Sequence, residues 1–164
     1  MIRNIPLTTL AAGLALGLGL GAPAARAAPL IGGAGEIAAD PLTGLALGGF
    51  DPVSYFVPGG PRPGRRELDH LWGGAAWRFA GEANREAFRR APEAYAPRLG
   101  GHDPEAAARG LLVAADPGVF AVRDGRLYLF RTPGARERFL ADPALAGLAE
   151  ARWGSLRGEL VAAP

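Results

Sequence analysis

A glycine pair between two aromatic segments constrains the fold of this chain more than any other feature. Gly73-Gly74 separates residues 68–72 from residues 75–79, and such a pair between apolar segments predicts a β-hairpin turn. An unbroken ladder around this turn would pair Leu68 with Phe79. Because side chains alternate between the faces of a strand, one face should hold the large residues. These are Leu68, His70, Trp72, Trp77 and Phe79. Such a face needs a second layer to cover it.

A second hairpin and several helices are predicted to supply that layer. Residues 119–130 surround Asp124-Gly125, a strong signal for a tight hairpin turn. Residues 82–91 predict a helix with Phe88 on its buried face, because its acidic residues come early and its arginines late. Aspartate, threonine and proline mark three further helix starts, at Asp103-Pro104, Thr132-Pro133 and Asp142-Pro143.

Together these elements predict an α+β fold of two short antiparallel hairpins with small helices packed on one side. The 164 residues suffice for one well-buried domain and are too few for two. We find no internal repeat in the sequence, and the two hairpins are expected to be unrelated.

The first 27 residues have the features of a secretory signal peptide. Arg3 gives a positive start, residues 10–20 form an uncharged apolar run, and Ala25-Arg26-Ala27 offers small residues to a signal peptidase. The apolar run is also about long enough for a membrane anchor, but its glycines and the Ala-x-Ala ending favour cleavage. We therefore predict an exported protein, periplasmic or secreted, with no stable membrane span after cleavage.

Cleavage would change the charge balance. All 18 basic side chains are arginine, against 16 acidic ones, which gives the full chain a net charge of +2. Residues 1–27 contain two of these arginines and no acid, so the remaining net charge is about zero and does not favour a nucleic-acid partner. We predict a linker or N-terminal arm at residues 28–49, a domain at 50–155 and a C-terminal tail at 156–164. The sequence identifies no protein partner.

The residue types and motifs that are missing exclude several activities. The chain has no cysteine, which excludes disulfides, thiolate metal sites, iron–sulfur clusters and a cysteine nucleophile. After the predicted signal peptide only Ser54 and Ser155 remain, and neither lies in a Gly-x-Ser-x-Gly motif. Phosphate-binding loops and dinucleotide fingerprints are absent from the sequence as well.

Aromatic and glycine motifs lie at fixed offsets between about Phe50 and Trp153. They are Asp51-Pro52-Val53-Ser54-Tyr55-Phe56, His70-x-Trp72-Gly-Gly-Ala-x-Trp77-x-Phe79, Asn84-Arg85-x-x-Phe88, Pro92-Glu93-x-Tyr95-x-Pro97, Gly100-Gly101, Asp116-Pro117-x-x-Phe120 and Asp124-Gly-x-Leu-Tyr-Leu129. With these motifs the chain resembles the exported bacterial branch of the YHS-domain family. The resemblance implies a small hairpin-plus-helix core and membership of a group often linked with metal handling. After the Gly100-Gly101 pair that branch usually has an aromatic residue and then cysteine, whereas this chain has His102 and Asp103.

Three side chains form the metal constellation that the sequence predicts: His70, His102 and Asp103. Imidazole and carboxylate ligands suit a divalent transition metal such as zinc, copper or iron. If the Gly100-Gly101 turn folds over the first hairpin, the two imidazoles approach each other. Each residue also has a structural interpretation, since His70 lies on the aromatic face, His102 in a loop, and Asp103 at the N-cap of the helix starting at Pro104.

The sequence thus predicts a non-catalytic binding or accessory module, for a metal ion or a small ligand. One alternative is a purely structural or protein-interaction domain. Another is a small enzyme that uses a His–Asp pair, which requires His102 to lie in a concave pocket. Five aromatic residues could line a ligand pocket but are more typical of a hydrophobic core. They are Trp72, Trp77, Phe79, Phe88 and Tyr95.

Overall fold

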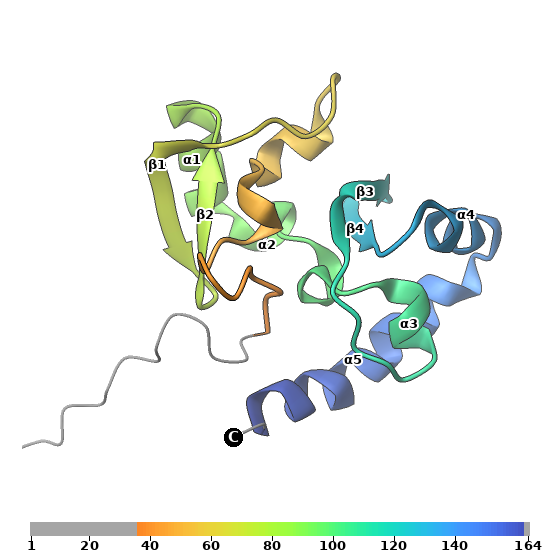
Figure 1. The fold of residues 1–164 in the computed structure, drawn as a ribbon. Helices are drawn as coiled ribbons and strands as arrows, with labels where there is room; N and C mark the ends of the chain where they lie inside the picture. Colours follow the sequence, from red (N-terminus) through yellow and green to blue (C-terminus); the bar gives the residue numbers. More distant parts are fainter. Residues whose placement is uncertain (1–35, 163–164) are drawn as a thin grey trace, which may run out of the picture.

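The computed structural model describes residues 36–162, and within them it shows an α+β fold (Figure 1). The described part contains five α-helices and two antiparallel two-stranded sheets, which confirms the predicted fold class. The predicted signal peptide at residues 1–27 lies outside the described residues. Among the described helices, none has the length and apolar character needed to cross a membrane.

The first hairpin forms around Gly73-Gly74, as predicted. It consists of β1 (Arg65–Trp72) and β2 (Ala75–Phe79). The predicted partner of Leu68 is wrong, because a bulge shifts the ladder and places Arg65 opposite Phe79. Leu68 is still buried, so the bulge bends the strand without moving this side chain out of the core.

Helix α1 (Glu82–Arg90) covers the aromatic face of this hairpin, as predicted. Phe88 is fully buried, and its ring centroid lies 4.9 Å from that of Trp77 and 5.3 Å from that of Phe79. The remaining elements of this half are the 3-10 helices η1 (Leu47–Gly49) and η2 (Pro52–Phe56) and the short helix α2 (Pro92–Tyr95). The aromatic residues therefore form a core rather than a ligand pocket.

The second hairpin is covered on both faces. It consists of β3 (Asp116–Arg123) and β4 (Arg126–Phe130), and its neighbours in the chain are η3 (Arg98–Gly101), α3 (Pro104–Ala108), α4 (Pro133–Ala141) and α5 (Ala144–Ala162). On one face Tyr128 and Phe130 pack against Phe139 of α4. On the other face Leu127 and Leu129 join the aromatic core of the first half. The second hairpin thus stands between the first half and α4 (Figure 1).

The two halves are repeats of one structural unit, which corrects the expectation that the hairpins are unrelated. The sequence Leu-Gly-Gly-x-Asp-Pro occurs at residues 47–52 and again at 99–104. Each occurrence leads into a hairpin and then a helix with a buried phenylalanine, Phe88 or Phe139. Leu99 follows Leu47 by 52 positions whereas Phe139 follows Phe88 by 51, so the second unit is one residue shorter. We call residues 45–96 the first repeat and residues 97–146 the second repeat.

The backbone conformation also repeats in the turn. Leu47 and Leu99 both have a φ of 55°, in the left-handed region that leucine rarely adopts. Gly49 and Gly101 both have a φ of 86°. The same unusual conformation at matching positions shows that the shared sequence folds into the same turn twice.

The packing of the aromatic residues is repeated with different side chains. The ring of Phe139 lies 4.9 Å from that of Tyr128, and Phe88 lies at the same distance from Trp77. Tyr128 follows Trp77 by 51 positions, so the two pairs are equivalent. Both hairpins also carry a bulge near the start of their first strand.

Part of the predicted N-terminal arm belongs to the folded unit. The amide of Ala38 donates to the carbonyl of Gly100 at 2.7 Å, which ties this segment to the second repeat. The amide of Ala46 donates to the carbonyl of Ala76 at 2.9 Å, which ties it to β2. The compact part therefore begins before residue 50.

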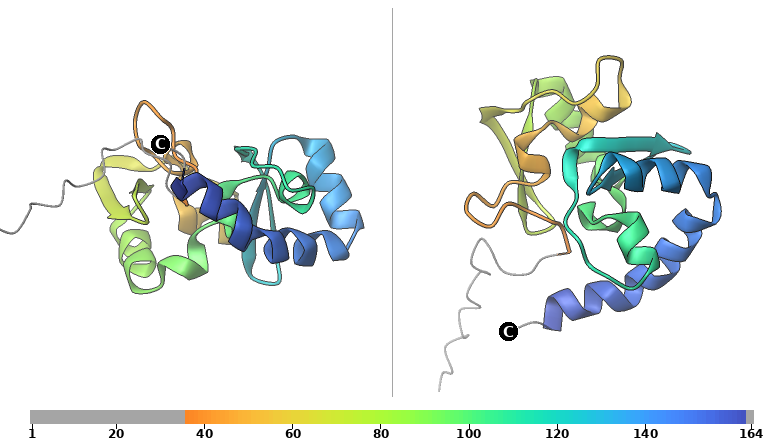
Figure 2. Two further views of the ribbon diagram at one scale, coloured as in Figure 1. Left: turned by 90° about the horizontal axis from the view of Figure 1, so that it is seen from below. Right: turned by 45° about the vertical axis from the view of Figure 1, so that its right-hand side comes forward.

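The predicted C-terminal tail is partly helical. Helix α5 (Ala144–Ala162) runs under α3 and through the segment expected to form the tail (Figure 2). Leu156 is buried in a small apolar cluster with Leu99 and Ala107. The helix is thus anchored on the turn and on α3 of the second repeat.

Candidate functional site

A buried aspartate organises each repeat. In the first repeat Asp51 is fully buried and accepts hydrogen bonds from the amides of Val53 and Ala80, both at 2.8 Å. The side chain of Asn84 donates to the same carboxylate at 2.6 Å. Asp51 thus links the start of η2, the end of β2 and α1.

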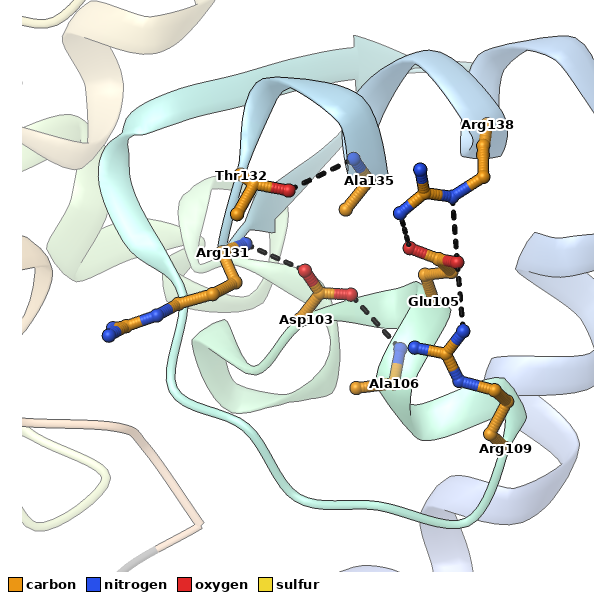
Figure 3. Close-up of polar contacts among 8 residues, drawn as sticks. All are labelled: Asp103, Glu105, Ala106, Arg109, Arg131, Thr132, Ala135 and Arg138. Atoms are coloured by element: carbon orange, nitrogen blue, oxygen red, sulfur yellow. Dashed lines mark hydrogen bonds and ion pairs between the residues drawn. The ribbon is translucent and has the colours of Figure 1, made fainter.

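Asp103 has the same role in the second repeat. This residue is one of the three predicted metal ligands, and its carboxylate binds backbone amides instead. It is buried and accepts from the amide of Ala106 at 3.0 Å, as the predicted N-cap of α3. Its second oxygen accepts from the amide of Arg131 at 2.6 Å (Figure 3). Both oxygens are therefore occupied by backbone donors.

His102 is turned toward the protein interior. Its Nδ1 lies 3.0 Å from the carbonyl oxygen of Leu99, and its ring lies 5.6 Å from that of Trp153 on α5. Burial lowers the pKa of His102, and the hydrogen bond to the carbonyl only partly offsets this effect. His102 and Asp103 each bond to backbone groups rather than to each other, so the structure gives no support to a catalytic His–Asp pair.

His70 lies in the other repeat, on β1. Its ring packs against Phe88, with 6.3 Å between the ring centroids. Among the described residues no group of three or more His, Asp or Glu side chains is arranged to hold a metal ion. The structure therefore does not bring His70, His102 and Asp103 together as a metal centre, and these residues do not fit the metal ion that the family resemblance implies.

A glutamate that the sequence analysis did not select is the most unusual side chain of the second repeat. Glu105 is buried, with 8% of its surface exposed. Arg138 donates to both its carboxylate oxygens at 2.8 Å, and Arg109 donates to one of them at 3.0 Å (Figure 3). The hydrogen bond from Arg138 is the main cause of a lowered pKa of Glu105. This carboxylate is thus ionised and holds two guanidinium groups in place.

The first repeat shows that the fold does not need these charges. Val53 stands at the position of Glu105, and Ala87 at the position of Arg138. Val53 belongs to the hydrophobic core of the first repeat, and the partly buried Ala87 packs against it. The fold therefore accommodates either apolar or charged residues at these two positions, and the charges of the second repeat are not a requirement of the architecture.

The two arginines remain accessible. Each guanidinium side chain is 61% exposed. Both line a pocket of about 380 Å³, together with Ala141, Asp142 and Leu145. Nε and Nη2 of Arg109 and Nη1 of Arg138 make no hydrogen bond with any described residue. These N–H groups can donate to an anion, for which a planar guanidinium is well suited.

The sequence holds one signal that would have found this site. When residues 47–52 are aligned with residues 99–104, the next position is Val53 in one repeat and Glu105 in the other. A charge at a position where the sister repeat is apolar indicates a specialised role. Without the alignment, Glu105 is an ordinary acidic residue in the first turn of a helix.

Replacing His102 by phenylalanine, the residue at the equivalent position 50, is expected to reduce the pH dependence of stability. Because the pKa of His102 is lowered by folding, the unfolded chain binds a proton first as pH falls below about 6.5. The wild-type protein should therefore lose stability from about pH 6.5 down to the folded pKa, by up to about 1.4 kcal/mol per pH unit.

Thermal melting at about pH 7.5 and about pH 5.5, on either side of the ordinary histidine pKa, measures this effect. The melting temperature should fall more in the wild type than in His102→Phe. His70 is the one other histidine and is present in both proteins, so its contribution cancels. If the melting temperature falls equally in the two proteins, folding does not change the pKa of His102.

No family model, curated protein or solved structure matches this chain in a comparison with known proteins. What the site can do therefore follows from its own residues: a buried carboxylate, two accessible guanidinium groups and an apolar wall. This combination is suited to binding an anion.

Proposed function

We propose that this protein is an exported, YHS-like, non-catalytic binding module that holds a small carboxylate ligand at Arg109 and Arg138. The observation that carries the proposal is the ion pair between the buried Glu105 and the exposed Arg138, at positions where the first repeat has Val53 and Ala87. Because the first repeat fills these positions with apolar residues, we assign the charged set a binding role rather than a packing role. Positioning two guanidinium groups at the mouth of a pocket is such a role.

The charges around the pocket favour a monoanion. Arg109 and Arg138 are balanced by Glu105 and Asp142, and Asp142 caps α5 by accepting from the amide of Ala144 at 2.9 Å. A ligand with several negative charges would meet these two carboxylates, whereas one carboxylate needs only the unused N–H groups of the arginines.

The apolar part of the ligand would contact α4 and α5. Ala141 ends α4 and Leu145 lies in the first turn of α5, and both line the same pocket as the arginines. The pocket volume of about 380 Å³ is at the small end of the range of about 300–1,000 Å³ that is typical of ligand sites. A short-chain carboxylate such as pentanoate matches both the charge and the size.

Calorimetric titration of the full-length protein with pentanoate tests the proposal. The wild type should bind, and the double variant Arg109→Gln, Arg138→Gln should bind at least about tenfold more weakly, because a charge-assisted hydrogen bond contributes about 1.5–3 kcal/mol. Arg89→Gln is the matched control, since Arg89 pairs with Glu86 on α1 of the first repeat. Its affinity should equal that of the wild type.

Two outcomes would reject the carboxylate site. Pentanoate binding that survives the double substitution would place the ligand elsewhere. No binding at all would leave the Glu105 cluster as a link between α3 and α4, and would favour the structural or interaction domain. A parallel titration with zinc chloride tests the metal alternative, which needs zinc binding that His70→Ala removes.

A further inference from the structure

A second pocket lies at the junction of the two repeats. It has a volume of about 260 Å³ and is bordered by the turn residues Leu47 and Gly48 of the first repeat and Gly101 of the second. Residues 38–41 of the N-terminal segment form one wall. Ligand sites are common where two structural units meet, and this pocket shares no lining residue with the one beside Glu105.

The walls of the junction pocket are apolar. The lining includes Ala38, Leu45, Leu47, Ala115, Pro117 and Leu129. Such walls suit a hydrocarbon group, because burying apolar surface is favourable.

One carboxylate, that of the solvent-exposed Asp40, lies at the edge of these apolar residues. Asp40 accepts three hydrogen bonds, from the amides of Leu42 (3.0 Å) and Thr43 (2.8 Å) and from the Thr43 hydroxyl (2.8 Å). All three go to Oδ1, and Oδ2 has no hydrogen-bond donor among the described residues. The turn thus fixes the carboxylate while one oxygen remains free to accept from a ligand.

The chemistry of this carboxylate selects the ligand class. Among the described residues that line this pocket, Asp40 is the one ionisable side chain, so they offer a single negative charge and no second ligand for a metal ion. An ammonium group is a compact donor of three hydrogen bonds and can bind one carboxylate oxygen. The Thr43 bonds also lower the pKa of Asp40 from the ordinary aspartate value, which is itself well below neutral pH.

We propose that the junction pocket binds a small primary amine, with its ammonium group on Oδ2 of Asp40 and its hydrocarbon chain between Ala115 and Leu129. The volume of about 260 Å³ lies just below the range of typical ligand pockets and limits the chain to a few carbons. This site is independent of the carboxylate site, because the two pockets lie on different elements.

Titration of the full-length protein with pentylammonium chloride tests the inference. The wild type should bind pentylammonium about two- to fivefold more tightly than 1-pentanol, which has the same chain and no charge, because an ion pair at an exposed carboxylate contributes modestly. Asp40→Asn should weaken pentylammonium binding by a similar factor, because it removes the charge and keeps an Oδ1 acceptor for the Leu42 and Thr43 amides. Pentanoate binding at Arg109 and Arg138 should be the same in Asp40→Asn as in the wild type.

A variant that fills the pocket gives a second test. Ala115→Leu should abolish pentylammonium binding and leave the circular dichroism spectrum unchanged. If Ala115→Leu does not fold, Ala39→Leu fills the pocket from the N-terminal segment and takes its place. The inference is overturned if pentylammonium does not bind, if 1-pentanol binds equally well, or if either Asp40→Asn or the folded pocket-filling variant retains wild-type affinity.

Discussion

Replacing Asp51 by alanine is expected to lower the free energy of unfolding by about 3–5 kcal/mol, the cost of breaking a buried charged network. The substitution leaves the amides of Val53 and Ala80 and the side chain of Asn84 without their acceptor, all beside the core. Small domains are stable by only about 5–15 kcal/mol, so much of the stability would be lost. Urea unfolding followed by circular dichroism measures the change.

Asp51→Asn and Asp103→Ala are the comparisons for this result. Asparagine keeps one acceptor oxygen, so its loss should be smaller than that of alanine. Asp103 serves two backbone donors rather than three groups, so Asp103→Ala should cost about 2–4 kcal/mol. A loss below about 1 kcal/mol in Asp51→Ala would mean that water satisfies the exposed donors, and that the aspartate does not hold the repeat together.

Replacing Gly100 by alanine is expected to cost about 2–4 kcal/mol, more than the same change at Gly48. Gly100 and Gly48 both have a positive φ, of 60° and 57°. A residue with a Cβ is destabilised in that conformation. A Cβ at Gly100 would also overlap the carbonyl oxygen of Glu36, whereas the nearest atom to a Cβ at Gly48 is in Pro117 at 3.8 Å. Gly48→Ala should therefore cost only about 1–2 kcal/mol.

Hydrogen exchange locates the origin of this difference. The amide of Ala38 donates to the carbonyl of Gly100. In Gly100→Ala the displaced N-terminal segment should lose this bond, so the Ala38 amide should exchange faster. In Gly48→Ala the Ala38 amide should stay protected. Equal losses of stability in the two variants, with Ala38 still protected, would contradict the docking of residues 36–38 on the turn of the second repeat.

The parts of the fold that were predicted correctly depend on local patterns. The Gly73-Gly74 turn, the helix over residues 82–90 and the N-cap at Asp103 each follow from a few neighbouring residues. The bulge after Arg65 was not predicted, because no residue type there requires it. Predicted ladders are regular unless a glycine or proline interrupts them.

The repeat was missed because large side chains differ at many equivalent positions and the spacing between the units changes by one residue. Trp77 corresponds to Tyr128, and Val53 to Glu105. The shared residues are the six-residue turn, 52 positions apart, and then the pairs Phe79/Phe130, Arg85/Arg136, Glu86/Glu137 and Phe88/Phe139, 51 positions apart. The matching φ values of Leu47 and Leu99 show that the shared turn sequence adopts the same conformation in both units.

The candidate site was missed for a different reason. Glu105 lies 33 positions before Arg138, and only the packing of α3 against α4 brings them together. The predicted ligands His102 and Asp103 were close in the chain but face backbone groups. Residue spacing in the sequence predicts caps and turns well, and contacts between separate elements poorly.

The outer face of the first hairpin sets the length of this architecture. There Asp69 and Arg78 form an ion pair, at the positions where the second hairpin has Phe120 and Leu129. The second pair packs against the first repeat, whereas the ion pair is partly exposed, with 43% of the Asp69 side chain and 23% of the Arg78 side chain accessible. An array extended at its N-terminal end would have to bury that ion pair, so natural or engineered lengthening requires apolar residues at 69 and 78 first. Polar termini of this kind limit such tandem architectures to a fixed size.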